Sequence, residues 1–298
     1  MTPASEGVWR TFLARFPRCR LYTVDPGAHA IAVEVAPLLR ELGRLDGWYA
    51  EGWSATRDPT LLAASALAAA LEPGDTLVLG SQTGFARTRA VLDAATERGA
   101  STVFLFDHWK NYAEHFAGGR LPCVVVLPDE FARQGFRAAL GGSPDCECEL
   151  AILPHPGIDA AVQRVRAFAP PAEPVVALLL DPTEIGDGLG YDWRGTLDAA
   201  IAAMRERPGH ALRVKQHPRQ DSAAVAAAIA ARRDAVDASL SMDETERLIA
   251  GAREVWGMTT VALNVALAAG KPIRSYQVGR TALGRLASNP HIERWAIT

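Results

Sequence analysis

The chain has 298 residues, of which 49% are hydrophobic and 22% are charged, and its mean hydropathy is +0.02. This is the composition of a folded globular protein, and at roughly 100–200 residues per domain the length allows two medium domains or one large one. The 31 Lys and Arg residues against 34 Asp and Glu residues give a net charge of -3, so there is no overall basic field to hold a polyanion. This balance argues against nucleic acid as the main partner.

We expect neither a membrane span nor an export signal in this sequence. No uninterrupted apolar run reaches the ~20 residues that a membrane-spanning helix needs, so we expect no membrane span. The start, Met1 to Arg10, lacks the basic and apolar regions of a signal peptide, and we expect a cytoplasmic protein. Four cysteines are too few for a disulfide framework. Cys146 and Cys148 have no second pair that would complete a metal site, so we interpret them as surface or edge-strand thiols.

From residue 19 onward, short apolar runs alternate with amphipathic or Ala-rich stretches. This pattern is typical of strands separated by crossover helices, so the fold class is α/β with a doubly wound parallel sheet. The strands expected in the first half are 20–24, 47–50, 76–80, 102–107, 123–127 and 149–153. The helices expected between them are 30–42, 61–71, 85–98 and 130–140.

The segment 168–174 has three prolines in seven residues, which cannot continue a helix, so we interpret it as a linker. The alternation then restarts. The second half is expected to contain strands 175–180, 211–216, 254–256 and 273–277, and helices 193–207, 222–232, 244–250 and 260–269. We therefore expect a first domain over 1–168, a second over 175–280, and a helix over 281–298 that crosses back onto the first domain.

Ligands of open α/β sheets bind at the carboxyl ends of the strands, and two sheets in tandem are expected to face each other across a cleft. The loop after the first strand contains Asp25, Gly27 and His29, where the glycine allows a tight turn and the helix start offers free N–H groups. A plain Pro-Gly turn capped by Asp25 is an equal alternative. After the third strand, Ser81 and Gln82 form a second turn suited to binding oxygen atoms, without the Gly-Lys-Ser/Thr of a phosphate loop.

The fourth strand is followed by the densest group of reactive side chains in the chain, Asp107-His108-Trp109-Lys110-Asn111-Tyr112. Asp107 or His108 is a candidate general base, and Trp109 and Tyr112 are candidates for stacking on a sugar or another ring. Packing between domains is the alternative role for these aromatic residues.

In the second half, the first strand leads into an acidic, glycine-rich loop over 181–190. It is a candidate lid, a candidate cation site formed by Asp181, Glu184 and Asp187, or a solvated loop. The next strand ends in Lys215-Gln216-His217-Pro218-Arg219, where a cation and an imidazole flank a proline turn, as in an anion clamp.

The sequence Gly257-Met258-Thr259-Thr260 joins another strand to a helix. Thr259 is a candidate helix cap, and the two threonines with the adjoining N–H groups form a candidate phosphate site at the positive end of the helix dipole. The helix is followed by Gly270-Lys271-Pro272, a typical helix end.

These last motifs, Lys215-x-His217-Pro218 and Gly257-x-Thr259-Thr260 with Gly270-Lys271-Pro272, resemble the donor half of GT-B glycosyltransferases. The resemblance is to capsule-type and bacterial sialyltransferase-like enzymes that use CMP- or CDP-activated donors. It implies two Rossmann-like domains and assigns the nucleotide phosphate to His217, Thr259 and Thr260. The first half resembles the acceptor half of surface-carbohydrate biosynthesis proteins related to nucleotide-sugar 2-epimerases.

The chain departs from the UDP-sugar enzymes of this fold in one respect. Those enzymes usually carry a ribose-binding Glu in the last donor helix, and this chain has none between Thr259 and Gly270. This absence slightly favours a cytidine donor over a uridine donor. We expect metal-independent transfer of a sugar from a nucleotide-activated donor to an acceptor hydroxyl of a glycan or small molecule, without a cofactor. Asp107, His108 or Asp25 would act as the base. The alternatives are a nucleotide-sugar 2-epimerase or hydrolase, and a binding module without catalysis.

Overall fold

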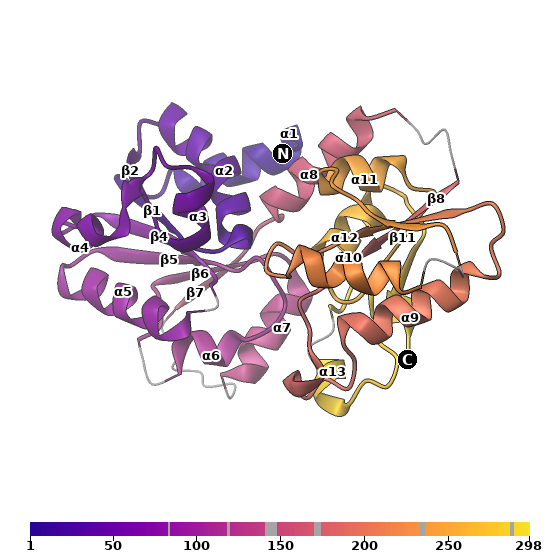
Figure 1. Cartoon of the computed structure of the whole chain (residues 1–298). Helices are drawn as coiled ribbons and strands as arrows, with labels where there is room; N and C mark the ends of the chain where they lie inside the picture. Colours follow the sequence, from indigo (N-terminus) through magenta and orange to yellow (C-terminus); the bar gives the residue numbers. More distant parts are fainter. Residues whose placement is uncertain (83, 118–119, 141–147, 170–173, 233–235, 287–288) are drawn as a thin grey trace. The chain divides into compact units, whose positions relative to one another are not determined.

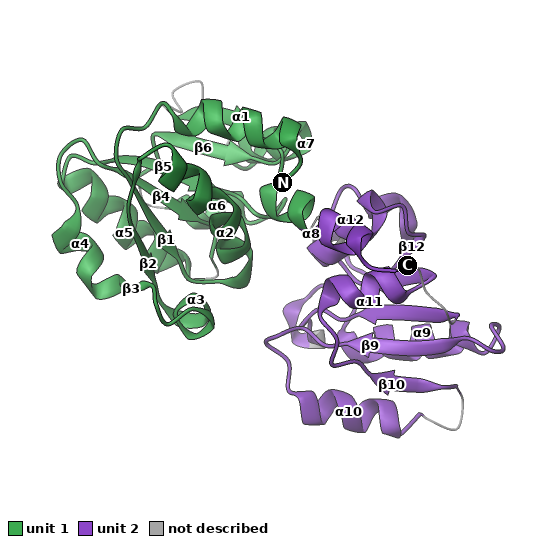
Figure 2. Ribbon diagram, turned by 90° about the horizontal axis from the view of Figure 1, so that it is seen from above, with its two compact units in different colours: residues 1–160 green, residues 161–298 purple. Residues whose placement is uncertain are grey.

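The computed structural model describes the chain except residues 83, 118–119, 141–147, 170–173, 233–235 and 287–288. Two compact units follow one another along the chain, Met1–Ala160 and Ala161–Thr298 (Figure 2). We call them the first and the second unit. Part of the expected linker, 170–173, and Cys146 lie outside the described residues, and the boundary between the units falls within helix α8 (Pro156–Ala167).

The first unit is built on a seven-stranded parallel sheet in the order β3-β2-β1-β4-β5-β6-β7 (Figure 1). Its strands are β1 (Cys19–Thr23), β2 (Leu45–Ala50), β3 (Leu62–Ala63), β4 (Thr76–Gly80), β5 (Ser101–Leu105), β6 (Val124–Leu127) and β7 (Glu149–Ile152). The strands β4 and β6 are buried along their whole length, and their sequences are mainly apolar, as expected of parallel strands covered on both faces.

Helices cover both faces of this sheet. One hydrophobic core joins α1 (Pro3–Leu13) and α2 (Pro26–Glu41) to residues such as Leu21 and Val103, and the other joins α5 (Phe85–Glu97) and α7 (Glu130–Ala139) to Leu79 and Phe104. The shorter helices are α3 (Gly52–Arg57), η1 (Ala64–Ala66), α4 (Leu67–Ala70) and α6 (Tyr112–Phe116). The result is the doubly wound, three-layer arrangement that the alternating pattern predicts.

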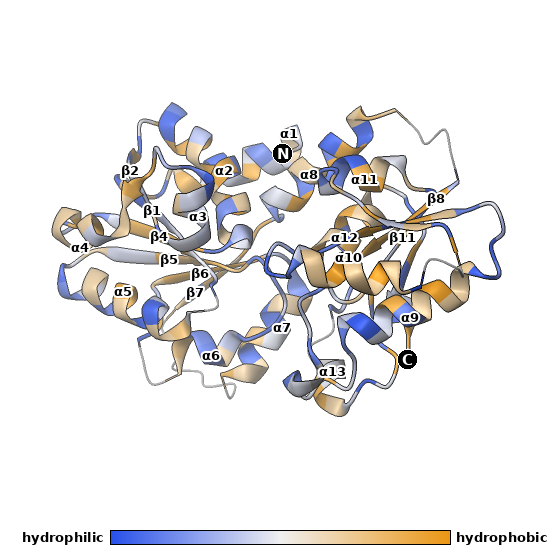
Figure 3. Cartoon of the chain, in the orientation of Figure 1, coloured by the Kyte–Doolittle hydropathy of each residue, from blue (hydrophilic) through white to orange (hydrophobic). Residues whose placement is uncertain are grey.

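The second unit repeats the plan with six parallel strands in the order β10-β9-β8-β11-β12-β13. The strands are β8 (Val175–Leu179), β9 (Ala211–Lys215), β10 (Ala238–Leu240), β11 (Glu254–Gly257), β12 (Ile273–Tyr276) and β13 (Ala296–Ile297). The helices are η2 (Ile185–Asp187), α9 (Trp193–Met204), α10 (Ser222–Ala230), α11 (Thr245–Gly251), α12 (Val261–Ala268), α13 (Ala282–Leu286) and η3 (Glu293–Trp295). Hydrophobic residues run along much of α9 and α10, whose buried side chains pack on the sheet (Figure 3).

The predicted strands are confirmed to within a few residues, and both halves of the chain form parallel α/β sheets. The single helix expected over 61–71 is wrong at its start. Leu62 and Ala63 instead pair with Tyr49 and Ala50 as the edge strand β3, and the helix is reduced to η1 and α4. The parallel pairing with β2 provides hydrogen-bond partners for backbone groups of β3. The helical periodicity of the sequence does not reveal this pairing.

The end of the chain also differs from the expectation. In place of a continuous helix over 281–298, the described residues form α13, η3 and a final strand, β13, whose Ala296 and Ile297 pair in parallel with Ser275 and Tyr276. Pro290 lacks the N–H needed within a helix, and the segment after it returns to the sheet of the second unit. The expected helix is therefore short, and the chain ends as an edge strand.

Candidate functional site

In each sheet, the chain winds outward in both directions from two adjacent central strands. These are β1 and β4 in the first unit and β8 and β11 in the second. The loops that follow these two strands at their carboxyl ends run to opposite faces of the sheet, and the space between them can hold a ligand. The predicted site residues Asp25, Ser81 and Thr259 come from these loops, so each unit has its own candidate site at this edge.

In the first unit, Asp107 is held by Ser81 and faces the start of α2. The Ser81 hydroxyl donates to Asp107 Oδ1, and the Asp107 backbone N–H donates to Ser81 Oγ over 3.3 Å. A Cβ atom added to Gly27 would lie 1.4 Å from Asp107 Oδ2. Gly27 therefore leaves the space that the carboxylate occupies, close to the positive end of the α2 dipole.

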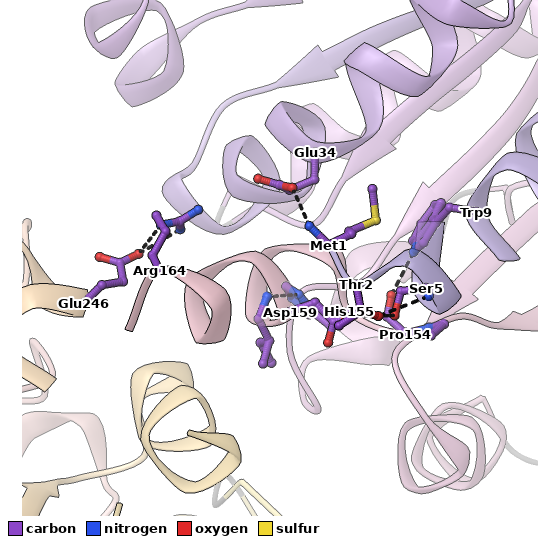
Figure 4. A network of polar contacts seen from close by, with 11 residues as sticks. Met1, Thr2, Ser5, Trp9, Glu34, Pro154, His155, Asp159, Arg164 and Glu246 are labelled. Atoms are coloured by element: carbon purple, nitrogen blue, oxygen red, sulfur yellow. Dashed lines mark hydrogen bonds and ion pairs between the residues drawn. The ribbon is translucent and has the colours of Figure 1, made fainter. Parts of the chain in front are cut away.

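Two histidines accompany this carboxylate. His108 Nε2 lies 3.8 Å from Asp107 Oδ1, and burial lowers the pKa of His108 while Asp107 opposes that shift. His155, which is not among the predicted site residues, follows β7 and accepts the Ile158 N–H at Nδ1 over 3.1 Å (Figure 4). Burial lowers the pKa of His155 as well, again against the charge of Asp107. A Pro-His-Pro sequence after a strand was the available signal for His155.

Helix α1 anchors the segment that carries His155. The Trp9 indole donates to the Pro154 carbonyl over 2.9 Å, and the Ser5 hydroxyl donates to Asp159 Oδ2 (Figure 4). Trp9 is 1% exposed, so its burial adds hydrophobic stabilisation to this attachment. The first helix thus holds in place the segment that carries His155.

The other predicted residues of the first unit lie in packed surroundings. His29 is buried, with ring centroids 5.3 Å from Trp48 and 5.4 Å from Trp53, and burial lowers its pKa. Asp25 occupies the N-cap position of α2 without a side-chain cap hydrogen bond. His29 thus lies within α2 with its side chain buried, whereas Asp25 lies in the turn that precedes the helix.

Gln82, Trp109 and Tyr112 are bound into the fold. Gln82 Nε2 donates to Thr88 Oγ1 over 2.8 Å, and the Trp109 indole donates to Asp129 Oδ2 over 2.6 Å. Tyr112 is 4% exposed and contributes to an aromatic core. Of the predicted residues of the first unit, Ser81, Asp107, His108 and Gly27 form one cluster, and Asp25 lies near enough for its charge to act on the pKa of His108.

The same aromatic core also encloses His115. The burial of this histidine predicts how the stability of the fold depends on pH. Its ring lies 4.8 Å from Phe85 and 5.2 Å from Phe104, neither nitrogen has a hydrogen-bond partner among the described residues, and burial lowers its pKa from 6.5 to about 4. The unfolded chain therefore binds a proton at higher pH than the folded chain, so stability falls as the pH drops from 6.5 to about 4.

We expect His115→Phe to remove up to about 3 kcal/mol of this acid destabilisation. Denaturant unfolding at a series of pH values measures it, with His210→Ala in the second unit as the control. An unchanged pH slope in His115→Phe would contradict the assignment.

In the second unit, Asp181 connects the two central loops. It follows β8 and is 8% exposed, and its Oδ2 accepts the Thr259 N–H over 2.8 Å and the Thr259 hydroxyl over 3.0 Å. The two residues are 78 positions apart in the chain. The donors expected to meet a phosphate at Thr259 are therefore engaged by a carboxylate of the protein.

His217 lies in the neighbouring turn after β9. Its Nδ1 accepts the Arg219 N–H over 3.2 Å, which leaves Nε2 to carry the proton of the neutral ring. Its own backbone N–H donates to Gln220 Oε1 over 2.7 Å, and Gln220 Nε2 donates to the Asp181 carbonyl over 3.2 Å. Burial lowers the pKa of His217, and the charge of Asp181 opposes this shift. Asp181 and Gln220 thus join the turns that carry His217 and Thr259.

The remaining predicted donor-site residues have defined structural contacts. Lys215 Nζ donates to the Asp243 carbonyl over 2.6 Å, and the Thr260 hydroxyl oxygen accepts the Ala262 N–H as the cap of α12. A Cβ on Gly257 would lie 3.0 Å from the Leu179 carbonyl oxygen, so this position favours glycine because β8 approaches closely. Of these residues, Thr260 belongs directly to the helix start beside Thr259.

The acidic loop uses its carboxylates internally. The Glu184 N–H donates to Asp187 Oδ2 over 2.8 Å, and the Glu184 carboxylate accepts from the Trp193 indole and from Arg194. Among the residues that the structure describes, no group of three or more His, Cys, Asp or Glu residues could hold a metal ion. Within the same part of the chain, no helix is long and apolar enough to cross a membrane.

Several solved structures share this architecture. S. aureus MnaA, solved with UDP, has a TM-score of 0.63 at 12% identity, covering 87% of this chain and 79% of that one. The UDP-GlcNAc 2-epimerase from Neisseria meningitidis, solved with UDP-GlcNAc, has a TM-score of 0.60 at 13% identity, covering 87% and 82%. A UDP-forming α,α-trehalose-phosphate synthase from Burkholderia xenovorans has a TM-score of 0.51 at 12% identity, covering 88% and 84%.

No protein-family model matches the sequence, and a search of curated proteins finds no match. At 12–13% identity, the likeness to these structures is one of fold. The chain has two parallel-sheet α/β domains, as do the GT-B-type glycosyltransferases and the nucleotide-sugar 2-epimerases that it resembles in structure.

Proposed function

We propose that the protein is a glycosyltransferase that moves a sugar from a nucleotide-activated donor to an acceptor hydroxyl. The observation that carries the proposal is a group at and beside the switch point of the second sheet. Thr259 and Thr260 follow β11, His217 follows β9, and Asp181 and Gln220 join these turns. Support comes from the fold, because S. aureus MnaA was solved with UDP and the Neisseria meningitidis epimerase with UDP-GlcNAc.

The second unit is assigned the donor. His217 would donate from Nε2 to a phosphate oxygen, and the Thr259–Thr260 helix start would add N–H and hydroxyl donors. Groups of this kind stabilise the negative charge that develops on a departing nucleotide, so the proposed transfer needs no metal. We favour a cytidine nucleotide because the last donor helix has no Glu for the ribose of a uridine donor.

The first unit is assigned proton transfer. Asp107 is the preferred base because the Ser81 hydroxyl and Gly27 hold its carboxylate in one place. His108 lies 3.8 Å away and is the next candidate, followed by Asp25. An ionised carboxylate that accepts the proton of a sugar hydroxyl is ordinary general-base chemistry.

The second candidate function is a nucleotide-sugar 2-epimerase or hydrolase. The likeness in fold to the Neisseria meningitidis epimerase, over 87% of this chain, favours it. Incubation with UDP-N-acetylhexosamines in the absence of an acceptor discriminates between the two, because only the epimerase or hydrolase forms product under these conditions.

A thermal-shift panel of CMP, CDP, UDP, UMP and GDP tests nucleotide binding. We expect a cytidine nucleotide to raise the unfolding temperature most, because a ligand that binds only the folded state stabilises it. We expect His217→Ala to remove the shift. His210→Ala is the matched control, since His210 precedes the amino end of β9 and His217 follows its carboxyl end. If none of the nucleotides shifts the unfolding temperature, the proposed function is wrong.

A further inference from the structure

The Asp181 carboxylate occupies the place at the start of α12 where a ligand's phosphate is expected. Its Oδ2 takes both donors of Thr259, the N–H over 2.8 Å and the hydroxyl over 3.0 Å. These are the kinds of donor that a helix start presents to an anion. Asp181 is 8% exposed, so the contact is shielded from water and its charge is felt strongly by neighbouring groups.

Tyr191 is a second feature of the same place. It is 3% exposed, and its hydroxyl lies close enough to the Thr259 side chain for that contact to lower its pKa, but it makes no hydrogen bond of ordinary geometry with the described residues. Burial and the charge of Asp181 raise the pKa of Tyr191 to about 12, so the hydroxyl keeps its proton and remains a donor. A buried hydroxyl without a well-formed hydrogen bond costs stability, and a ligand oxygen that completes the hydrogen bond removes this cost.

We propose that the Asp181 carboxylate is an internal substitute for phosphate, and that a nucleotide's phosphate takes over the Thr259 donors and the Tyr191 hydroxyl when it binds. This inference rests on the proposed donor site and adds two residues to it. Two anions cannot share the same donors at this distance, so Asp181 must leave Thr259 when phosphate arrives. The carboxylate therefore lowers the affinity for phosphate below what the remaining groups would give.

Asp181→Asn tests this competition, because asparagine keeps an oxygen that can accept from Thr259 and removes the charge. We expect pyrophosphate and CDP to bind about tenfold more tightly, as the loss of one charge a few ångströms from the phosphate implies. Cytidine, which has no phosphate, should bind unchanged. Isothermal titration calorimetry measures all three ligands.

The matched control is Asp221→Asn. Asp221 caps α10 by accepting the Ala223 N–H over 2.9 Å, a role that asparagine fills equally well, and this substitution also removes one negative charge from the second unit. We expect it to leave pyrophosphate binding unchanged. A gain in affinity equal to that of Asp181→Asn would overturn the inference, because it would reflect net charge alone.

Tyr191→Phe provides an independent test should Asp181→Asn not fold. Because the hydroxyl makes no hydrogen bond of ordinary geometry with the described residues, we expect an unfolding temperature close to that of the unsubstituted protein and roughly tenfold weaker pyrophosphate binding. If the unsubstituted protein binds pyrophosphate and either variant shows no change or the opposite change, this inference fails and the donor site stands. If neither the unsubstituted protein nor any variant binds pyrophosphate or a nucleotide, both proposals fail.

Discussion

Asp107→Asn is expected to lower turnover by about 10²–10⁴-fold, the usual contribution of a general base. Asparagine has nearly the shape of aspartate and keeps an oxygen for the Ser81 hydroxyl, so the unfolding temperature should change little. What is lost is the capacity to take a proton. Turnover with the donor identified by the nucleotide panel measures the effect, and nucleotide binding to the second unit should be unchanged.

Asp58→Asn is the matched control for this substitution. Asp58 also lies in the first unit, and its Oδ1 accepts the Thr60 N–H over 3.1 Å and the Thr60 hydroxyl over 2.6 Å, a role that the asparagine oxygen also fills. Turnover should therefore stay near that of the unsubstituted protein. Asp107→Asn with undiminished turnover would exclude Asp107 as the base and leave His108 and Asp25.

Gly27→Ala is expected to lower both stability and turnover. The added Cβ would lie 1.4 Å from Asp107 Oδ2, so either the carboxylate or the start of α2 must move. Insertion of a methyl group into a packed site typically costs about 1–3 kcal/mol. Because the displaced carboxylate is the proposed base, turnover should fall toward that of Asp107→Asn. Denaturant unfolding and the same activity assay measure the two effects.

The double substitution Gly27→Ala with Asp107→Ala separates the clash from other causes. Removal of the carboxylate also removes the atom that the new methyl group meets, so the double variant should recover much of the lost stability, and the coupling is read from a double-mutant cycle. Gly7→Ala is the control, since its Cβ would meet no atom within 4 Å and alanine favours the helix. Additive losses in the cycle would contradict the packing of Asp107 against Gly27.

Much of the fold follows from patterns within short stretches of sequence. The strands β4 and β8 are short, mainly apolar runs ended by turn residues, and such runs between helical segments indicate buried strands. Helix α1 was not predicted, although Trp9, Phe12 and Leu13 have helical spacing and all three are buried. Strand β3 has only two residues, Leu62 and Ala63, and carries no such pattern because pairing with β2 alone makes it a strand.

The candidate sites, like the fold, could be predicted only in part from the sequence. Parallel strands bring their carboxyl ends to one edge, so the positions of Asp107, His217 and Thr259 at strand ends were readable from the chain alone. Their partners were not, because a side-chain contact between distant segments leaves no local signal. The bond from Thr259 to Asp181 spans 78 positions, and the space that Gly27 leaves for Asp107 likewise exists only once β1 and β5 lie in one sheet. Local order along the chain thus reflects burial and backbone geometry, whereas the hydrogen bonds and charges that set the chemistry arise from packing between segments far apart in sequence.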